Sequence, residues 1–182
     1  QPTKSVLVQV RKSLDSKQIL PNGRLAECEA AVLLYKLHGI LPAMETIIAY
    51  TDGGARGNPG PAAIGVHIID SAGKVVKEVK QHIGNSTNNF AEYNAVMVAL
   101  ETLKQLYGKR SKEIQFEIRL DSELVQKQLS HEYQIKEPGL VPMFVAIHNL
   151  RVANFPKITF KHVPREQNKE ADRLVNEALD GV

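Results

Sequence analysis

The chain has 182 residues, of which 43% are hydrophobic and 24% are charged, the composition of an ordinary soluble domain that can bury a core. No run of about 18 apolar residues occurs, so a membrane-spanning helix is not expected. The single cysteine, Cys28, excludes an internal disulfide, and the net charge of +3 is too small to indicate a nucleic-acid-binding protein by itself. The first residues lack the pattern of a secretory signal, so we expect a cytoplasmic location.

Residues 1–45 give a weaker structural signal than the rest of the chain. Within them, residues 24–41 have the apolar spacing of a helix and are followed by Pro42. Residues 5–14 could form either a strand or a helix. We expect a short N-terminal extension that is partly helical and whose role the sequence does not define.

Three strands are predicted next. β-Branched and apolar residues are concentrated in residues 45–52, 62–70 and 74–84. A glycine- and proline-rich segment, residues 53–61, separates the first two strands and predicts a turn. The short segment 71–73 indicates a hairpin loop between antiparallel strands.

The remaining sequence alternates between helical and extended patterns. Helical spacing or capping predicts four helices, at residues 88–106, 122–133, 140–152 and 166–179. Two further strands are predicted, at residues 113–120 and 157–163. Three hairpin-connected strands followed by alternating helices and strands predict an α/β fold, in which helices flank a mixed five-stranded sheet.

Four acidic residues occupy notable positions in these elements. Asp52 ends the first predicted strand, Glu92 lies in the first turn of the long helix, Asp121 ends the fourth strand, and Asp172 lies inside the last helix. Strand ends and adjoining helix starts converge on one rim of such a fold, where an acid is costly unless a cation accompanies it. Divalent Mg²⁺ or Mn²⁺ would serve, since both prefer hard oxygen ligands. Helix dipoles or solvation explain each acid alone, except Asp52, which has no evident structural duty.

Four sequence blocks resemble the motifs of the type 1 ribonuclease H family. They are YTDGGARGNPGPAAIG, STNNFAEYNA, LDSELV and HVPREQNKEADRLVN, in this order within residues 46–180. The resemblance implies a ribonuclease H-like fold, with a catalytic domain at residues 46–182 behind the N-terminal extension. It also implies an endonuclease that hydrolyses the RNA strand of RNA–DNA hybrids. The chain lacks the basic, tryptophan-containing insertion of the best-known bacterial members and is similar to the compact branch of the family.

The resemblance also implies catalytic roles. Asp52, Glu92, Asp121 and Asp172 match the metal-binding carboxylates of the family, which implies two Mg²⁺ ions with Mn²⁺ as a substitute. His162 matches a histidine that assists catalysis by moving protons or helping the product to leave. The alternative for His162 is a surface histidine at the end of a strand.

Small polar residues match the substrate-binding positions of the family. Thr87, Asn88 and Asn89 match residues that contact the backbone and minor-groove edge of the hybrid, and Asn58 matches a residue that contacts the RNA strand. Asn168, grouped with them, is expected to steady the loop before the last helix. Thr87 and Asn88 are also good helix caps, and both roles can coexist.

Two other functions fit the same motifs. One is a relative with a different task, either a nuclease for double-stranded RNA or a domain detached from a reverse transcriptase. The other is a catalytically silent nucleic-acid-binding module, which the presence of all four acids disfavours. We expect a monomer whose partner is the RNA–DNA hybrid, with double-stranded RNA as a second candidate partner and no membrane association.

Overall fold

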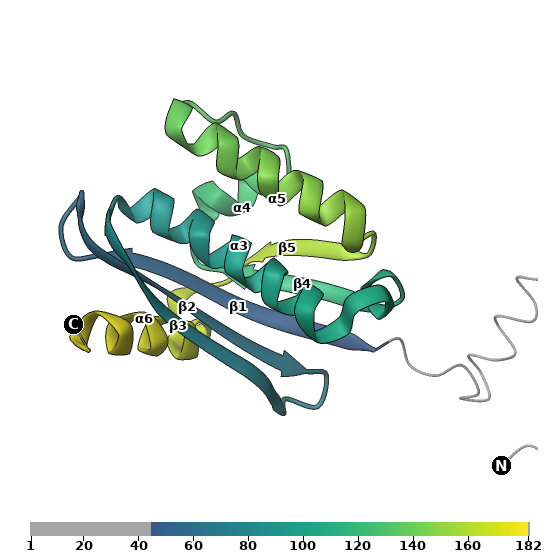
Figure 1. Ribbon diagram of the computed structural model, residues 1–182. Helices are drawn as coiled ribbons and strands as arrows, with labels where there is room; N and C mark the ends of the chain where they lie inside the picture. Colours follow the sequence, from purple (N-terminus) through teal and green to yellow (C-terminus); the bar gives the residue numbers. More distant parts are fainter. Residues whose placement is uncertain (1–44, 182) are drawn as a thin grey trace, which may run out of the picture. The chain divides into compact units, whose positions relative to one another are not determined.

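The structure, a computed structural model, describes residues 45–181, and the expectations for residues 1–44 lie outside this range. The described residues form one five-stranded sheet with helices on both faces (Figure 1). The strands are β1 (Thr46–Ala55), β2 (Gly60–Asp70), β3 (Val75–Ser86), β4 (Gln115–Leu120) and β5 (Ile158–His162). The helices are α3 (Asn88–Tyr107), α4 (Glu123–Leu129), α5 (Val141–Asn154) and α6 (Lys169–Asp180), with short 3₁₀ turns at Gly108–Lys112, Pro138–Leu140 and Arg165–Gln167. Among residues 45–181, none of the helices combines the length and the hydrophobicity of a transmembrane span.

The strand order β3-β2-β1-β4-β5 confirms the predicted mixed sheet. The hairpin-connected strands β1, β2 and β3 are antiparallel, whereas β4 and β5 run parallel to β1 because helices separate them in the chain. Thr51 and Leu120 are the last paired residues of the β1–β4 ladder. Asp52 and Asp121 follow them directly, so the pairing brings two acids to the same edge of the sheet.

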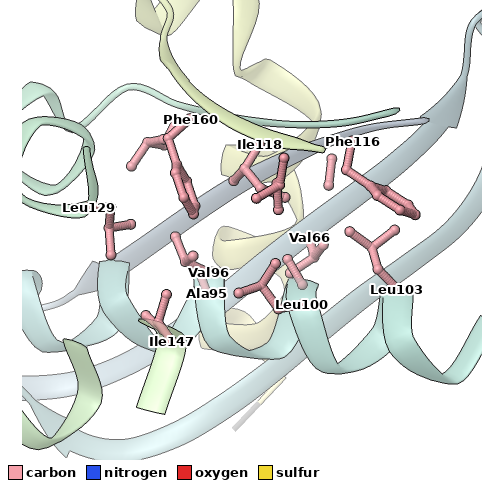
Figure 2. Packing of buried hydrophobic residues seen from close by; sticks show 14 of the residues in the cluster. Val66, Ala95, Val96, Leu100, Leu103, Phe116, Ile118, Leu129, Ile147 and Phe160 are labelled. Atoms are coloured by element: carbon pink, nitrogen blue, oxygen red, sulfur yellow. The ribbon is translucent and has the colours of Figure 1, made fainter. Parts of the chain in front are cut away.

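Helix α3 supplies the central part of the core. Figure 2 shows its apolar side chains facing those of the sheet, with Ile147 of α5 packed in the same cluster. Leu100 and Leu103 have no exposed surface, and burying each contributes about 2 kcal/mol. Leu106, the last residue of the helix predicted at residues 88–106, is 45% exposed. On the opposite face of the sheet, α6 packs Val175 against Ala63.

The first strand is longer, and the turn after it shorter, than the sequence predicted. Gly53 and Gly54 continue β1 to Ala55, and β2 already begins at Gly60. Gly53 lies directly against the backbone of α3, because a Cβ atom at this position would be 2.2 Å from the carbonyl carbon of Ala91. Glycine therefore marks a close approach between strand and helix here, rather than a turn.

This close approach predicts a large effect of one methyl group. We expect Gly53→Ala to lower the free energy of unfolding by about 3 kcal/mol, since the added Cβ would meet backbone that cannot move aside. Gly139→Ala is the control, because a Cβ there meets nothing within 4 Å, and its effect should stay within about 0.5 kcal/mol. Urea denaturation measures both values, and equal stabilities of the two variants would contradict the close packing of α3 on β1.

Candidate active site

Three carboxylates converge at the edge of the sheet where the β1–β4 ladder ends. Asp52, Glu92 and Asp121 each offer an oxygen that lies within 4.8 Å of the others. Strand pairing aligns Asp52 with Asp121, and the contact of Gly53 with the α3 backbone brings Glu92 beside them. Asp172, in the first turn of α6, lines the same cavity of about 340 Å³ but is exposed and stands outside this group of three.

Two of these acids occupy positions that differ from the prediction. Asp52 lies within β1, three residues before its last residue, because the strand continues through the glycines that follow. Glu92 lies in the second turn of α3, whose first turn contains no acidic residue. A favourable interaction with the helix dipole therefore does not account for Glu92, which is only 7% exposed.

Burial and mutual repulsion favour the protonated forms of these acids. Burial first, and then the charges of Asp121 and Asp172, raise the pKa of Asp52 to about 7. The pKa of Glu92 is raised well above its usual range by burial first, and then by the charges of Asp52 and Asp121. Glu92 Oε2 is buried and has no hydrogen-bond partner in the described part of the chain. An all-oxygen set of clustered carboxylates with an unpaired buried oxygen fits a hard divalent cation such as Mg²⁺ or Mn²⁺.

Cationic side chains at this cavity were not singled out from the sequence. Arg165 Nε lies 3.5 Å from Asp121 Oδ2, although the Arg165 side chain is 90% exposed. Its charge lowers the pKa of Asp52 and of Glu92, opposing part of the effect of burial. Arg56 and Lys169 also line the cavity. Their position within the motif blocks was the available signal, but exposed positive charges are usually only solvated.

His162 lies at the rim of this group. It is the last residue of β5 and is paired with Leu120, as expected for a histidine at the exit of that strand. Its Nε2 lies 3.2 Å from the backbone oxygen of Asp121, and its side chain is exposed. The ring therefore lies beside the backbone of one of the three acids, with access to solvent.

The polar residues at the start of α3 form a connected network. Thr87 Oγ1 accepts a hydrogen bond from the backbone N–H of Phe90 at 3.3 Å, which confirms Thr87 as a helix cap. The backbone N–H of Asn88 donates to Asn58 Oδ1 at 3.2 Å, while Asn88 Oδ1 accepts from the backbone N–H of Ala55 at 3.0 Å. These bonds tie the β1–β2 turn to α3, and Asn88 itself lines the carboxylate cavity.

The remaining two predicted residues do not line this cavity. Asn89 lines a second cavity of about 430 Å³, together with Tyr133 and other residues of α4 and of the segment that follows it. Asn168 is 1% exposed and lies behind the carboxylates, where its Nδ2 donates to Thr51 O and to Asp121 Oδ1. From inside the fold, Asn168 therefore contacts the last β1 residue that pairs with β4 and the aspartate that follows β4.

Comparison with known proteins identifies the family. Residues 50–178 match the family model described as reverse transcriptase-like. The structure of LC11-RNase H1, isolated from compost, is 48% identical with a TM-score of 0.73, and the match covers 76% of this chain and 98% of that one. The chain belongs to the type 1 ribonuclease H family. The crystal structure of the ribonuclease H1 of Halobacterium salinarum is 41% identical with a TM-score of 0.68, covering 75% of this ribonuclease H chain and 99% of its own.

Curated relatives are longer than the region that matches. The ribonuclease HI of Halobacterium salinarum is 42% identical over 132 residues, which cover 72% of this chain and 63% of the relative. A bifunctional protein of Mycobacterium tuberculosis is 36% identical over 137 residues, which cover 75% of this chain and 36% of the relative. The similarity therefore concerns the ribonuclease H domain and spans less than two thirds of these relatives.

The raised pKa of Asp52 predicts how the stability of the metal-free protein changes with pH. A carboxyl group with a pKa of 3.8 in the unfolded chain and about 7 in the folded state holds its proton longer when folded. The free energy of unfolding therefore falls as the pH rises between these two values. In EDTA we expect the melting temperature to be roughly 5 °C or more lower at about pH 8 than at about pH 5.

The variant Asp52→Asn separates this effect from other titrations. It lacks the titrating carboxyl group, so its melting temperature should fall distinctly less over the same pH range. Melting curves of both proteins in EDTA measure the difference. A decrease of the same size in the two proteins would contradict the assignment of this pH dependence to Asp52.

Proposed function

We propose that this protein hydrolyses the RNA strand of RNA–DNA hybrids, with Mg²⁺ as the metal it requires. The observation that carries the proposal is the group formed by Asp52, Glu92 and Asp121, in an open cavity that Asp172 also lines. All four acids stand in the motif blocks of the family. LC11-RNase H1 has been crystallised with an RNA/DNA hybrid, and this chain covers 97% of that structure at 47% identity.

The carboxylates hold the metal ions in this proposal. Asp52, Glu92 and Asp121 supply converging oxygens, and Asp172 adds a carboxylate from α6. Two divalent ions, when bound, activate a water for in-line attack and stabilise the departing 3′ oxygen. The protein provides a fixed cluster of ligands, whose ionised carboxylates repel one another unless cations are bound.

Groups around the cavity bind the nucleic acid. Arg56 and Lys169 place positive charge beside the carboxylates, where the phosphate backbone of a duplex approaches. The start of α3, with Thr87 and Asn88, offers backbone N–H groups and small polar side chains to a phosphate or to a ribose hydroxyl. Contacts to the 2′-hydroxyl distinguish the RNA strand from DNA.

One assay tests the proposed activity and separates it from its alternatives. The full chain is incubated with matched RNA–DNA, RNA–RNA and DNA–DNA duplexes, with and without Mg²⁺. We expect cleavage of the RNA strand of the hybrid alone, and only with Mg²⁺. Equal cleavage of the RNA–RNA duplex would replace the proposal by a broader duplex specificity. Binding of the hybrid without cleavage would make the chain a silent binding module.

Removing one carboxylate should abolish cleavage without unfolding the protein. We expect Asp52→Asn and Glu92→Gln each to reduce the cleavage rate by at least about a hundredfold, because each removes an oxygen that binds the metal. Glu101→Gln is the control, since Glu101 lies on the same helix as Glu92 but is exposed and away from the cavity. Retained Mg²⁺-dependent activity in either of the first two variants, at wild-type level, would overturn the site.

His162 is expected to act on protons during turnover. His162→Ala should lower kcat by about tenfold to a hundredfold and leave KM nearly unchanged, because a proton-transfer group contributes little to ground-state binding. The matched control is His131→Asn, since the backbone of His131 has a φ of 63° and asparagine tolerates that conformation. Steady-state kinetics of both variants measure the effect. Unfolding of the His162 variant, or two silent variants, would contradict the proposed role.

A further inference from the structure

Asn168 forms hydrogen bonds next to both Asp52, in β1, and Asp121, which follows β4. It precedes α6, and its Nδ2 donates to Thr51 O at 3.0 Å and to Asp121 Oδ1 at 3.2 Å. Thr51 is the last β1 residue paired with β4 and stands immediately before Asp52. One buried amide group therefore contacts the chain at both aspartates.

The contacts fix which end of this amide faces the carboxylate. Thr51 O and Asp121 Oδ1 are both acceptors, so only the amino group can be turned toward them. Asn168 Oδ1 is then buried and receives no hydrogen bond from any residue of the described range. An asparagine at the start of a helix usually accepts from a first-turn N–H with this oxygen, and Asn168 forms no such bond with α6. The Asn168 side chain therefore does not cap α6, and its amino group donates a hydrogen bond to Asp121 instead.

Asp121 lies among acidic groups that repel it when they are ionised. Oxygens of Asp52 and Glu92 lie within 4.8 Å of an Asp121 oxygen. Repulsion between ionised carboxylates would rotate Asp121 away from the group. A buried N–H donor at Oδ1 opposes this rotation, while Oδ2 faces the exposed guanidinium of Arg165 at 3.5 Å.

We propose that Asn168 is a positioning residue that holds Asp121, and the backbone before Asp52, in the geometry that binds a divalent ion. It acts through these aspartates and does not touch the hybrid, being 1% exposed. The inference rests on the proposed function for its catalytic consequence. The direct effect of Asn168 is on the affinity of the protein for metal, which can be measured without nucleic acid.

The test compares Mn²⁺ binding by Asn168→Ala and by the wild type. Isothermal titration calorimetry and the loss of the electron paramagnetic resonance signal of free Mn²⁺ measure the binding. Residues that orient metal ligands typically contribute tenfold to a hundredfold in affinity, so we expect Mn²⁺ binding to weaken by about this factor. Hybrid cleavage should fall at low metal concentration and recover at saturating metal, with KM for the hybrid unchanged. A purely structural role would not produce recovery by metal.

Asn154→Ala is the matched control. Asn154 Nδ2 donates to Leu150 O at 2.9 Å within α5, so this variant loses a comparable amide bond away from the carboxylates. It should bind Mn²⁺ like wild type. Wild-type Mn²⁺ affinity in Asn168→Ala would overturn the inference, and so would an increased KM with unchanged metal affinity, which would indicate direct contact with the hybrid.

A second variant keeps the test decisive if Asn168→Ala does not fold. Asn168→Ser supplies a hydroxyl that can cap α6 but cannot donate to Thr51 O and Asp121 Oδ1 together. It should also bind Mn²⁺ more weakly than wild type, and wild-type affinity would overturn the inference. Lack of hybrid cleavage by the wild-type protein would refute the proposed function instead, and the Mn²⁺ measurements would still decide the role of Asn168.

Discussion

The cluster of Asp52, Glu92 and Asp121 depends on the parallel pairing of β1 with β4. This pairing ends at Thr51 and Leu120, and an aspartate follows each of these residues in the chain. Neighbouring carboxylates repel, and partial burial increases the cost of their charges. The apolar core beneath them offsets that cost. Ala49 of β1 and Ile118 of β4 have no exposed surface and pack in the cluster that α3 completes. Hydrophobic burial thus stabilises a strand arrangement that electrostatics alone would disfavour.

Two glycines bring helices from opposite faces to this edge of the sheet. A Cβ at Gly53 would collide with the backbone of α3, and a Cβ at Gly65 would lie 2.2 Å from the carbonyl oxygen of Ala171 in α6. Gly65 is also the antiparallel partner of Asp52. The contact of Gly53 with α3 places Glu92 beside Asp52 and Asp121. The contact of Gly65 with α6 places Asp172, the residue after Ala171, at the cavity that these three acids line. Because Gly53 and Gly65 have no side chain, the helices can approach the strands closely enough for their acids to reach the site.

Much of this arrangement was predictable because the signals are local in sequence. Apolar periodicity predicted the order of strands and helices, and the motif blocks singled out the acids. Contacts between distant segments were not predictable in this way. Gly53 was assigned to a turn because a glycine needed for close packing has the same sequence signal as one needed for a turn. The position of Asn168 depends on the ends of two strands far away in the chain, and nothing near it in the sequence indicates the direction of its amide.

Strand pairing and helix packing bring Asp52, Glu92 and Asp121 together at a site that, as we propose, binds a divalent metal. Crystals of the protein grown with Mn²⁺ test it most directly, through the anomalous scattering of the metal. We expect a strong anomalous peak within ligand distance of all three carboxylates, and its loss in crystals of Asp52→Asn. A map with no peak among these carboxylates at saturating Mn²⁺, or with a peak held only by other residues, would contradict it.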